Sequence, residues 1–159
     1  MDETKSITLA GETSKSGTLR FDGGSRGNPG NAGCGFALII NPNTDKQETV
    51  QGAFYLGNHL TNNYAEYVGL IEGLKRAIAL GVSDIFIEGD SMLVIKQSAG
   101  LWKVNSPSLL PLHLKVVELL SCFKNHAFGH ILRAKNKESD ELANMAMDFP
   151  HVYPWNGIS

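Results

Sequence analysis

A short apolar strand that runs into an acidic, glycine-rich segment constrains this chain more than any other feature. Residues 19–30 read LRFDGGSRGNPG, so Asp22 follows apolar residues and four glycines fall within the eight residues 23–30. Glycine and proline interrupt regular structure and allow tight backbone paths. We therefore expect the strand to end at Asp22, at one end of a sheet, beside a loop whose N–H groups can approach a ligand. The alternative is a hairpin turn with a solvated Asp22.

Five segments with strand composition predict an α/β fold. The first three are joined by short turns and therefore form an antiparallel meander. Helical segments precede the other two, which lets them join the sheet as parallel strands. The fold class expected is a five-stranded mixed sheet, three antiparallel strands followed by two parallel ones, flanked by helices. The expected strands cover residues 18–22, 35–40, 47–56, 84–90 and 127–132.

Helical periodicity marks the remaining segments. The first helix follows Thr61, Asn62 and Asn63, which offer N-cap chemistry, and Gly81 suits its end. Asn136 is expected to cap the last helix. The other expected helices cover residues 91–98, 108–124 and 137–148.

One folded domain accounts for most of the 159 residues. We expect a polar arm over 1–16, the domain over 17–148, and an aromatic tail over 149–159 that packs on the domain by default, with a partner as the alternative. Cys34 and Cys122 lie far apart in apolar stretches and fit a reducing compartment, so a cytoplasmic or otherwise intracellular protein is expected. No apolar run is long enough to cross a bilayer.

Four acidic residues fall at boundaries between the expected elements. Asp22 and Asp90 end strands that can be parallel neighbours, so their carboxylates share the sheet edge where open α/β sheets place ligands. Glu66 and Asp140 are expected in the first turns of two helices. Taken singly, Glu66 and Asp140 are explained more simply by the preference of acids for helix N-termini.

Carboxylates that are held together repel one another and lose solvation, so such a cluster needs bound cations or protons. Hard oxygen ligands favour Mg²⁺ or Mn²⁺. Two such ions about 4 Å apart hold both the attacking water and the leaving oxygen of an in-line phosphoryl transfer. The net charge of −2 supplies no global positive field, so nucleic-acid binding must rest on a local patch or on bound cations.

Four motifs stand out in the chain: DGGSRGNPG at 22–30, TNNYAE at 61–66, GDS at 89–91 and NKESDELA at 136–143. They resemble the motifs of type 1 ribonuclease H, in the order of that family and at compatible spacings. Together they lie within residues 19–148, which is nearly the whole chain. The resemblance implies the ribonuclease H-like fold.

The resemblance also implies an endonuclease that hydrolyses the RNA strand of RNA–DNA hybrids by a two-metal mechanism and leaves 5′-phosphates. Two Mg²⁺ ions, or Mn²⁺ ions, would be the cofactors, and Glu66 would also meet the 2′-hydroxyl that marks RNA. Asn62 and Asn63 fit plain helix caps equally well. The implied metal ligands and catalytic acids are Asp22, Glu66, Asp90 and Asp140. The implied substrate contacts are Gly23, Asn28, Thr61, Asn62, Asn63 and Asn105.

The chain departs from the family pattern at three places. Met92 stands where many members carry a polar substrate-binding residue. Residues 102–105 leave no room for the basic handle helix that many bacterial members use, so we expect weaker hybrid binding. The stretch 129–136 resembles the loop-less branch, in which an arginine that matches Arg133 replaces a mobile histidine. His130 is the rival for this accessory role, and we expect it to be a structural residue of the last strand.

Three other functions compete with hybrid cleavage. A close variant would also cut double-stranded RNA. A non-catalytic hybrid-binding module on the same fold is a second class, although repelling acids bring little to binding alone. An exonuclease or DNA-processing nuclease is a third class. We expect the protein to act as a monomer.

Overall fold

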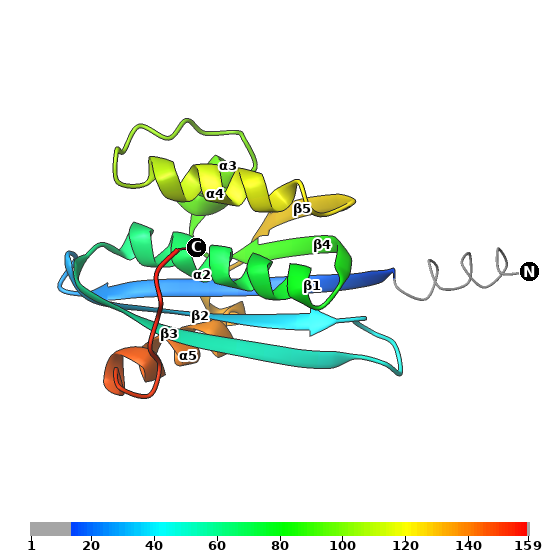
Figure 1. Ribbon diagram of the computed structural model, residues 1–159, viewed down its shortest axis with the longest axis horizontal. Coiled ribbons are helices and arrows are strands. Elements are labelled where there is room, and N and C mark those ends of the chain that lie inside the picture. The colour runs from blue at the N-terminus through cyan, green and yellow to red at the C-terminus, as the bar shows by residue number, and fades with distance from the viewer. Residues whose placement is uncertain (1–13, 159) are drawn as a thin grey trace, which may run out of the picture.

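The sheet is organised around its long first strand, as the sequence predicts. The computed structural model describes residues 14–158, and its strand order is β3-β2-β1-β4-β5 (Figure 1). Strands β1, β2 and β3 pair antiparallel, whereas β4 and β5 join β1 as parallel strands, which confirms the expected mixed sheet. The strands are β1 (Lys15–Arg26), β2 (Gly30–Ile40), β3 (Glu48–Leu60), β4 (Val82–Gly89) and β5 (Asn125–His130).

Helices cover both faces of the sheet. Helices α2 and α4 lie on one face and α5 lies on the other (Figure 1). The main core fills the space between the sheet and α2, where Phe21, Phe36 and Leu74 are fully buried. The helices are α2 (Asn62–Ala79), α3 (Met92–Ser98), α4 (Leu110–Leu120) and α5 (Lys137–Asp148), with a 3-10 turn, η1 (Arg133–Lys135), before α5.

The glycine-rich segment is mostly strand, which corrects the expectation that the first strand ends at Asp22. Strand β1 continues to Arg26 because Gly23 and Gly24 pair with Cys34 and Gly33 of β2. The loop shrinks to residues 27–29, where Gly27 adopts a φ of +113° that only glycine takes without strain. Strands β2 and β3 are accordingly longer than expected, and β5 begins and ends two residues earlier.

The ends of the helices follow the expected chemistry in part. Thr61 caps α2 by accepting a hydrogen bond from the N–H of Tyr64, and Gly81 follows the helix with a φ of +82°. Helix α4 is shorter than expected at both ends, since turns occupy the flanking residues. Asn136 precedes α5 but does not cap it with its side chain, which corrects that expectation. Its amide donates instead to the Phe21 carbonyl, at 2.8 Å.

The two ends of the chain differ in what the structure describes. The expected N-terminal arm lies outside the described residues except for its last three, of which Lys15 and Ser16 belong to β1. The tail crosses the edge of the sheet toward α2 (Figure 1). There the Tyr153 carbonyl accepts from the N–H of Tyr55, at 2.7 Å, and Trp155 Nε1 donates to Glu72 Oε2, at 3.1 Å. The tail therefore packs on the domain, as expected.

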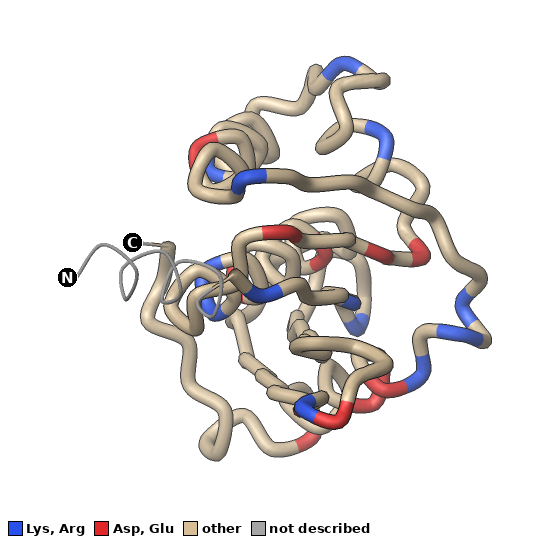
Figure 2. Tube along the Cα trace, turned by 90° about the vertical axis from the view of Figure 1, so that its right-hand side faces the viewer, with Lys and Arg blue, Asp and Glu red and all other residues tan. Residues whose placement is uncertain are grey.

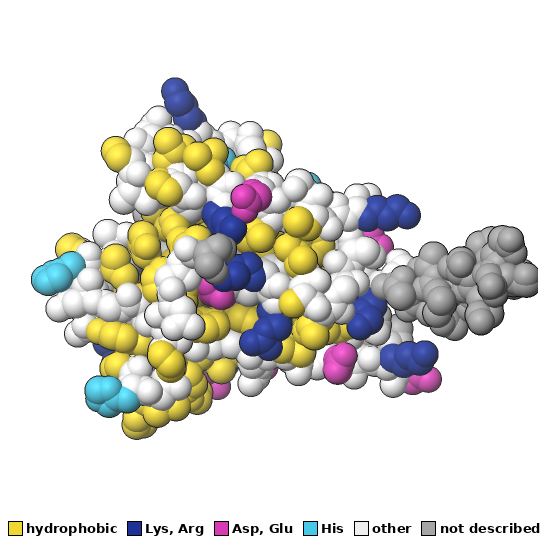
Figure 3. Space-filling view, in the orientation of Figure 1, with side chains coloured by type: hydrophobic (Ala, Val, Ile, Leu, Met, Phe, Trp, Pro, Cys, Tyr) yellow, Lys and Arg dark blue, Asp and Glu magenta, His cyan; other side chains and the backbone are white. Residues whose placement is uncertain are grey.

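Charged residues of both signs are spread over the described fold (Figure 2). Figure 2 shows Lys and Arg as well as Asp and Glu in several parts of the trace, and the net charge is −2. Hydrophobic side chains reach the surface above α2 and along the tail (Figure 3). Within α4, Leu110, Leu114 and Val117 are exposed. None of the helices in residues 14–158 has the length and apolarity to cross a membrane.

Candidate active site

Two of the four acids meet because the parallel ladder between β1 and β4 stops just before them. The last paired residues of this ladder are Phe21 and Gly89. Asp22 and Asp90 are the next residues on the two strands, so both lie at the carboxyl end of β4. This is the sheet edge that the sequence predicts, although β1 itself runs on past it.

Glu66 reaches the same place because α2 packs unusually close to β1. A Cβ built on Gly23 would lie 2.3 Å from the carbonyl carbon of Ala65, and one built on Gly69 would lie 2.8 Å from the Asp22 carbonyl oxygen. Only glycine at these two positions lets the helix backbone touch the strand. Glu66 is the fifth residue of α2, just past the first turn, which corrects the expected position.

The three acids form a tight and largely buried cluster. Asp22, Glu66 and Asp90 each place one carboxylate oxygen within 4.8 Å of the others. Asp22 and Glu66 are only 6% and 9% exposed. Asp22 Oδ1 accepts from the N–H of Gly23, at 2.9 Å, whereas Glu66 Oε1 is buried without a hydrogen-bond partner among the described residues. A buried carboxylate oxygen without a donor is unfavourable unless another positive group satisfies it.

The electrostatics of the cluster favour the binding of a cation. Burial, and then repulsion from Asp90, raise the pKa of Asp22 to about 7. Burial, and then repulsion from Asp22 and Asp90, raise the pKa of Glu66 well above its usual value. Hard carboxylate oxygens are the ligands that Mg²⁺ and Mn²⁺ prefer. The donor set and the unpartnered oxygen of Glu66 therefore fit a divalent cation.

Asp140 joins the site from the opposite face of the sheet. Close packing of α5 on β2 makes this possible, since a Cβ on Gly35 would lie 2.6 Å from Leu142 Cβ. Asp140 lies in the first turn of α5, as expected, and its carboxyl group contributes to the raised pKa of Asp22. All four acids line one cavity of about 550 Å³. The structure thus brings together the four carboxylates that the sequence analysis singles out.

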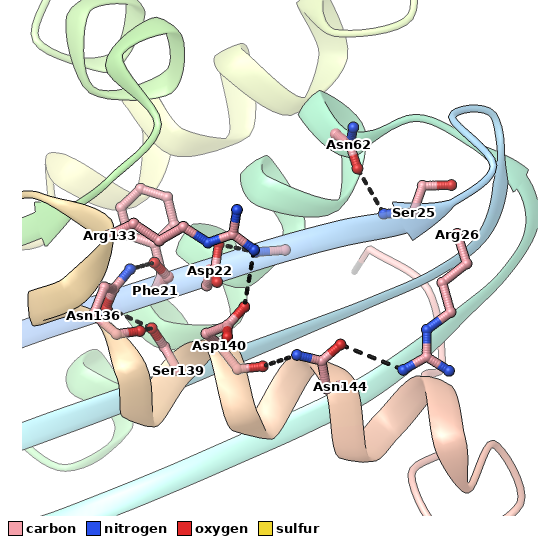
Figure 4. Close-up of polar contacts among 11 residues, drawn as sticks. Phe21, Asp22, Ser25, Arg26, Asn62, Arg133, Asn136, Ser139, Asp140 and Asn144 are labelled. Carbon is pink, nitrogen blue, oxygen red and sulfur yellow. Dashed lines mark hydrogen bonds and ion pairs between the residues drawn. The ribbon is translucent and has the colours of Figure 1, made fainter.

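Arg133 and His130, the two candidates for the accessory role, both line this cavity. Arg133 belongs to η1, and its Nη2 lies 3.9 Å from Asp140 Oδ1 (Figure 4). Its side chain is 81% exposed, so it is free to reorient. His130 is the last residue of β5, and its Nε2 lies 3.2 Å from the Asp90 carbonyl oxygen. This contact with the backbone fits the structural role expected for His130.

The expected substrate contacts divide into two groups. Gly23 and Asn62 line the cavity, whereas the cavity wall formed by the described residues does not include Asn28, Thr61, Asn63 or Asn105. The Asn62 side chain is not a cap of α2, because its Oδ1 accepts from the N–H of Ser25, at 2.7 Å (Figure 4). Asn28 Oδ1 in turn accepts from the N–H of Asn62, at 2.9 Å. These contacts hold the turn between β1 and β2 against the start of α2.

Two of the three departures from the family pattern, at Met92 and at the handle, are visible in the structure. Met92 begins α3 and is 41% exposed. The connection between α3 and α4 covers residues 99–109 and contains no helix, so the handle is absent from the described chain as expected. Asn105 is exposed within this connection.

Sequence reasoning missed two polar residues of the cavity, Arg26 at the end of β1 and Asn144 on α5. Arg26, Asn144 and Met147 line the same cavity as the acids. Asn144 Nδ2 donates to the Asp140 carbonyl oxygen, at 3.1 Å, and Asn144 Oδ1 accepts from Arg26 Nη2, at 3.3 Å (Figure 4). A spacing of four residues could have indicated both positions. Asn144 follows Asp140 by four residues on a helix, and Arg26 follows Asp22 by four residues on a strand, so each lies on the same face as an acid.

Comparison with known proteins gives consistent results for most of the chain. A family model described as reverse transcriptase-like matches residues 20–146. Ribonuclease HI of Halobacterium salinarum is 42% identical over 128 residues, which make up 80% of this chain and 62% of that protein. This chain therefore spans less than two thirds of the length of that relative.

Solved structures are similar in fold as well as in sequence. The N-terminal RNase H domain of a Mycobacterium tuberculosis protein, solved as a fusion with maltose-binding protein, is 40% identical with a TM-score of 0.78, over 84% of this chain and 94% of that one. LC11-RNase H1, solved in complex with an RNA/DNA hybrid, is 33% identical with a TM-score of 0.75, over 85% of this chain and 99% of that one. The segment matched by the family model contains all four clustered acids.

Proposed function

The chain belongs to the type 1 ribonuclease H family, and on that premise we propose that it is a divalent-metal-dependent endonuclease. Its substrate is the RNA strand of RNA–DNA hybrids, and its products carry 5′-phosphates. The observation that carries the proposal is the convergence of carboxylate oxygens from β1, α2 and the residue after β4 within 4.8 Å. A module that only bound hybrids would gain nothing from burying acids that repel one another and its polyanionic ligand.

The cation ligands in this proposal are Asp22, Glu66, Asp90 and Asp140. Mg²⁺ is the proposed ion, with Mn²⁺ as the alternative, because all four donors are hard oxygens. Two such ions, when bound, activate the attacking water and stabilise the leaving oxygen of a phosphoryl transfer. The protein acts as an intracellular monomer in this proposal.

The residues of the chain prepare this chemistry in three ways. The N–H of Gly23 holds the Asp22 carboxylate in place, at 2.9 Å. Burial of Asp22 and Glu66 keeps bulk water away from their oxygens, which strengthens their interaction with any cation. Arg133 brings positive charge to the exposed side of the cavity, beside Asp140, where the negative charge of a cleaved phosphodiester must be accommodated.

Recognition of the hybrid is assigned to the neighbouring polar surface. Gly23 and Asn62 line the cavity beside the acids, and Asn28 is fixed against the backbone of Asn62. We infer that these residues meet ribose and base edges in the minor groove. Thr61, Asn63 and Asn105 complete the proposed contact set on exposed surface outside the cavity, and their assignment rests on the motifs.

Cleavage of three substrates tests the proposal. With Mg²⁺, the protein is expected to cut an RNA–DNA hybrid and to leave double-stranded DNA intact, while a double-stranded RNA arm shows whether the specificity extends to that duplex. Asp90→Asn keeps the shape of the side chain but removes one charge from the cluster, so cleavage should fall to background.

Asp84→Asn is the matched control, because Asp84 lies in β4, the strand that Asp90 follows, but contacts Asn125 Nδ2, at 2.7 Å, outside the cavity. This variant should cut the hybrid at the wild-type rate. An intact hybrid, or an Asp90→Asn variant as active as Asp84→Asn, would show that the acids do not serve a nuclease.

A further inference from the structure

Arg26 lies in the same cavity as the acids but has no part in the function described so far. It is the last residue of β1, four positions beyond Asp22, or about 13 Å along an extended strand. Among the described residues that line this cavity, the arginines are Arg26 and Arg133. Figure 4 shows them at opposite ends of the row of polar side chains that runs along α5.

The Arg26 guanidinium is held in place from α5. Its Nη1 lies 2.7 Å from Asp148 Oδ1, and its Nη2 donates to Asn144 Oδ1, at 3.3 Å. Asn144 is itself fixed, because its amide donates to the Asp140 carbonyl oxygen. The Arg26 side chain nevertheless remains 48% exposed. An oriented but accessible guanidinium loses little conformational freedom when it binds an anion.

The negative charge of the cavity explains why a site for nucleic acid would need this arginine. Four carboxylates line the cavity and repel the phosphates of a nucleic acid strand wherever a cation does not neutralise them. A guanidinium has five N–H donors in a planar fork, so contacts with Asp148 and Asn144 leave donors for a phosphate. Phosphate contacts of this kind position a strand without reading its sequence.

We propose that Arg26 binds a backbone phosphate of the strand that is cleaved, at a phosphate some distance from the scissile one. Asn144 and Asp148 are positioning residues that aim the guanidinium. The inference rests on the proposed function, since it takes the acids to mark where that strand passes. The rival explanation is that Arg26 only ties the turn between β1 and β2 to α5.

Salt dependence separates phosphate binding from a purely structural tie. Each phosphate contact adds about 0.9 to the slope of log affinity against log salt. We expect Arg26→Gln to reduce the slope of kcat/KM against salt by about that amount and to raise KM about twofold to fivefold near 0.1 M salt, with little change in kcat.

Two matched variants complete this experiment. Arg20→Gln removes another arginine of β1, which pairs with Glu88 at 2.9 Å outside the cavity, and should leave both slope and KM unchanged. Asp148→Asn breaks the same tie to α5 but retains the Arg26 charge, so it should keep the wild-type slope. If Arg26→Gln and Asp148→Asn lose thermal stability equally and both keep the wild-type slope, Arg26 is only a tie.

Neutralising single phosphates locates the contact. A series of hybrids each carries one methylphosphonate at a different position of the RNA strand. The rates at which the wild-type protein and Arg26→Gln cut each hybrid are compared. We expect one position, away from the cleaved bond, where the substitution slows the wild type but has no further effect on the variant. The same penalty in both proteins at every position would overturn the inference. A wild-type protein that cuts no hybrid at all would instead overturn the proposed function.

Discussion

At the scale of single residues, the raised pKa of Asp22 makes stability depend on pH. Its pKa lies near 7 in the folded protein and near 3.8 ordinarily, so between these values the folded state holds more protons than the unfolded state. Stability therefore falls as pH rises from about 4 to about 7 in the absence of divalent ions. Glu66, whose pKa is also raised, acts in the same direction.

Thermal melting in a chelator checks this prediction. We expect the melting temperature to fall by several degrees between pH 5 and pH 8, and Mg²⁺ to restore it at pH 8, because the ion binds the deprotonated acids. Asp22→Asn removes the titrating group, so its melting temperature should change less over the same range. A wild-type melting temperature that stays level in the chelator, or falls no less in Asp22→Asn, would contradict the prediction.

The two accessory candidates make opposite predictions. Arg133 is exposed and lies 3.9 Å from Asp140, so Arg133→Ala should lower kcat by about tenfold or more through loss of positive charge beside the acids. His130 contacts only the Asp90 backbone among the described polar partners, so His130→Ala should have a much smaller effect on kcat. Steady-state kinetics on one hybrid compare the variants. If only the histidine variant is slow, the assignment of Arg133 is wrong.

At the scale of elements, the distance between α2 and β1 decides whether Glu66 reaches the site. Gly23→Ala would place a methyl group 2.3 Å from the Ala65 carbonyl carbon, so the helix must move away. Backbone has little room to adjust, and we expect a loss of about 3 kcal/mol or more in the free energy of unfolding, together with loss of hybrid cleavage.

Gly24→Ala is the control for this substitution. Among the described residues, the nearest atom to a Cβ at this neighbouring position is Asn62 Oδ1, at 3.8 Å, so the free energy of unfolding of the variant should lie within about 0.5 kcal/mol of the wild-type value. Urea unfolding of both variants gives the comparison. Equal stability of the two would show that α2 does not depend on Gly23 for its approach.

Local chemistry explains which elements the sequence could predict. Short turns and helical crossovers fix the strand directions, and Thr61 and Gly81 mark the ends of α2. Composition gives the wrong end for β1, because Gly23 and Gly24 have the composition of a loop but pair with β2 in the sheet. Asn136 has the composition of a cap, but a contact with Phe21, over a hundred residues away in sequence, takes its side chain instead.

Local sequence predicts part of the candidate site, and tertiary contacts decide the rest. The end of β4 and the start of α5 place Asp90 and Asp140 from local sequence alone. The approach of Glu66 depends on tertiary contacts between glycines and helix backbone, which no local pattern reveals. Arg26 was missed because its partners, Asn144 and Asp148, come from an element more than a hundred residues later.

At the scale of the whole molecule, the proposed function requires a polyanion to bind a protein whose net charge is negative. Its net charge is −2, residues of both signs occur in several parts of the trace (Figure 2), and the connection over residues 99–109 contains no handle helix. Arg26 and Arg133 supply local positive charge at the cavity, and cations held by the acids must supply the rest. Hybrid binding should therefore be weak and depend more on Mg²⁺ than on salt-sensitive contacts with Lys and Arg.

Affinity for an RNA–DNA hybrid, measured over a range of salt concentrations with and without Mg²⁺, tests this view of the molecule. With Mg²⁺, affinity is measured on Asp90→Asn, which should not cleave the hybrid. Without Mg²⁺, affinity is measured on the wild type in a chelator. Few direct phosphate contacts predict a shallow dependence on salt and dissociation constants in the micromolar range. Mg²⁺ should tighten hybrid binding more in the wild type than in Asp90→Asn. For the wild type, which is expected to cleave the hybrid in Mg²⁺, binding is read from KM. A steep salt slope with nanomolar binding in the chelator would mean that basic side chains, rather than cations at the acids, hold the hybrid.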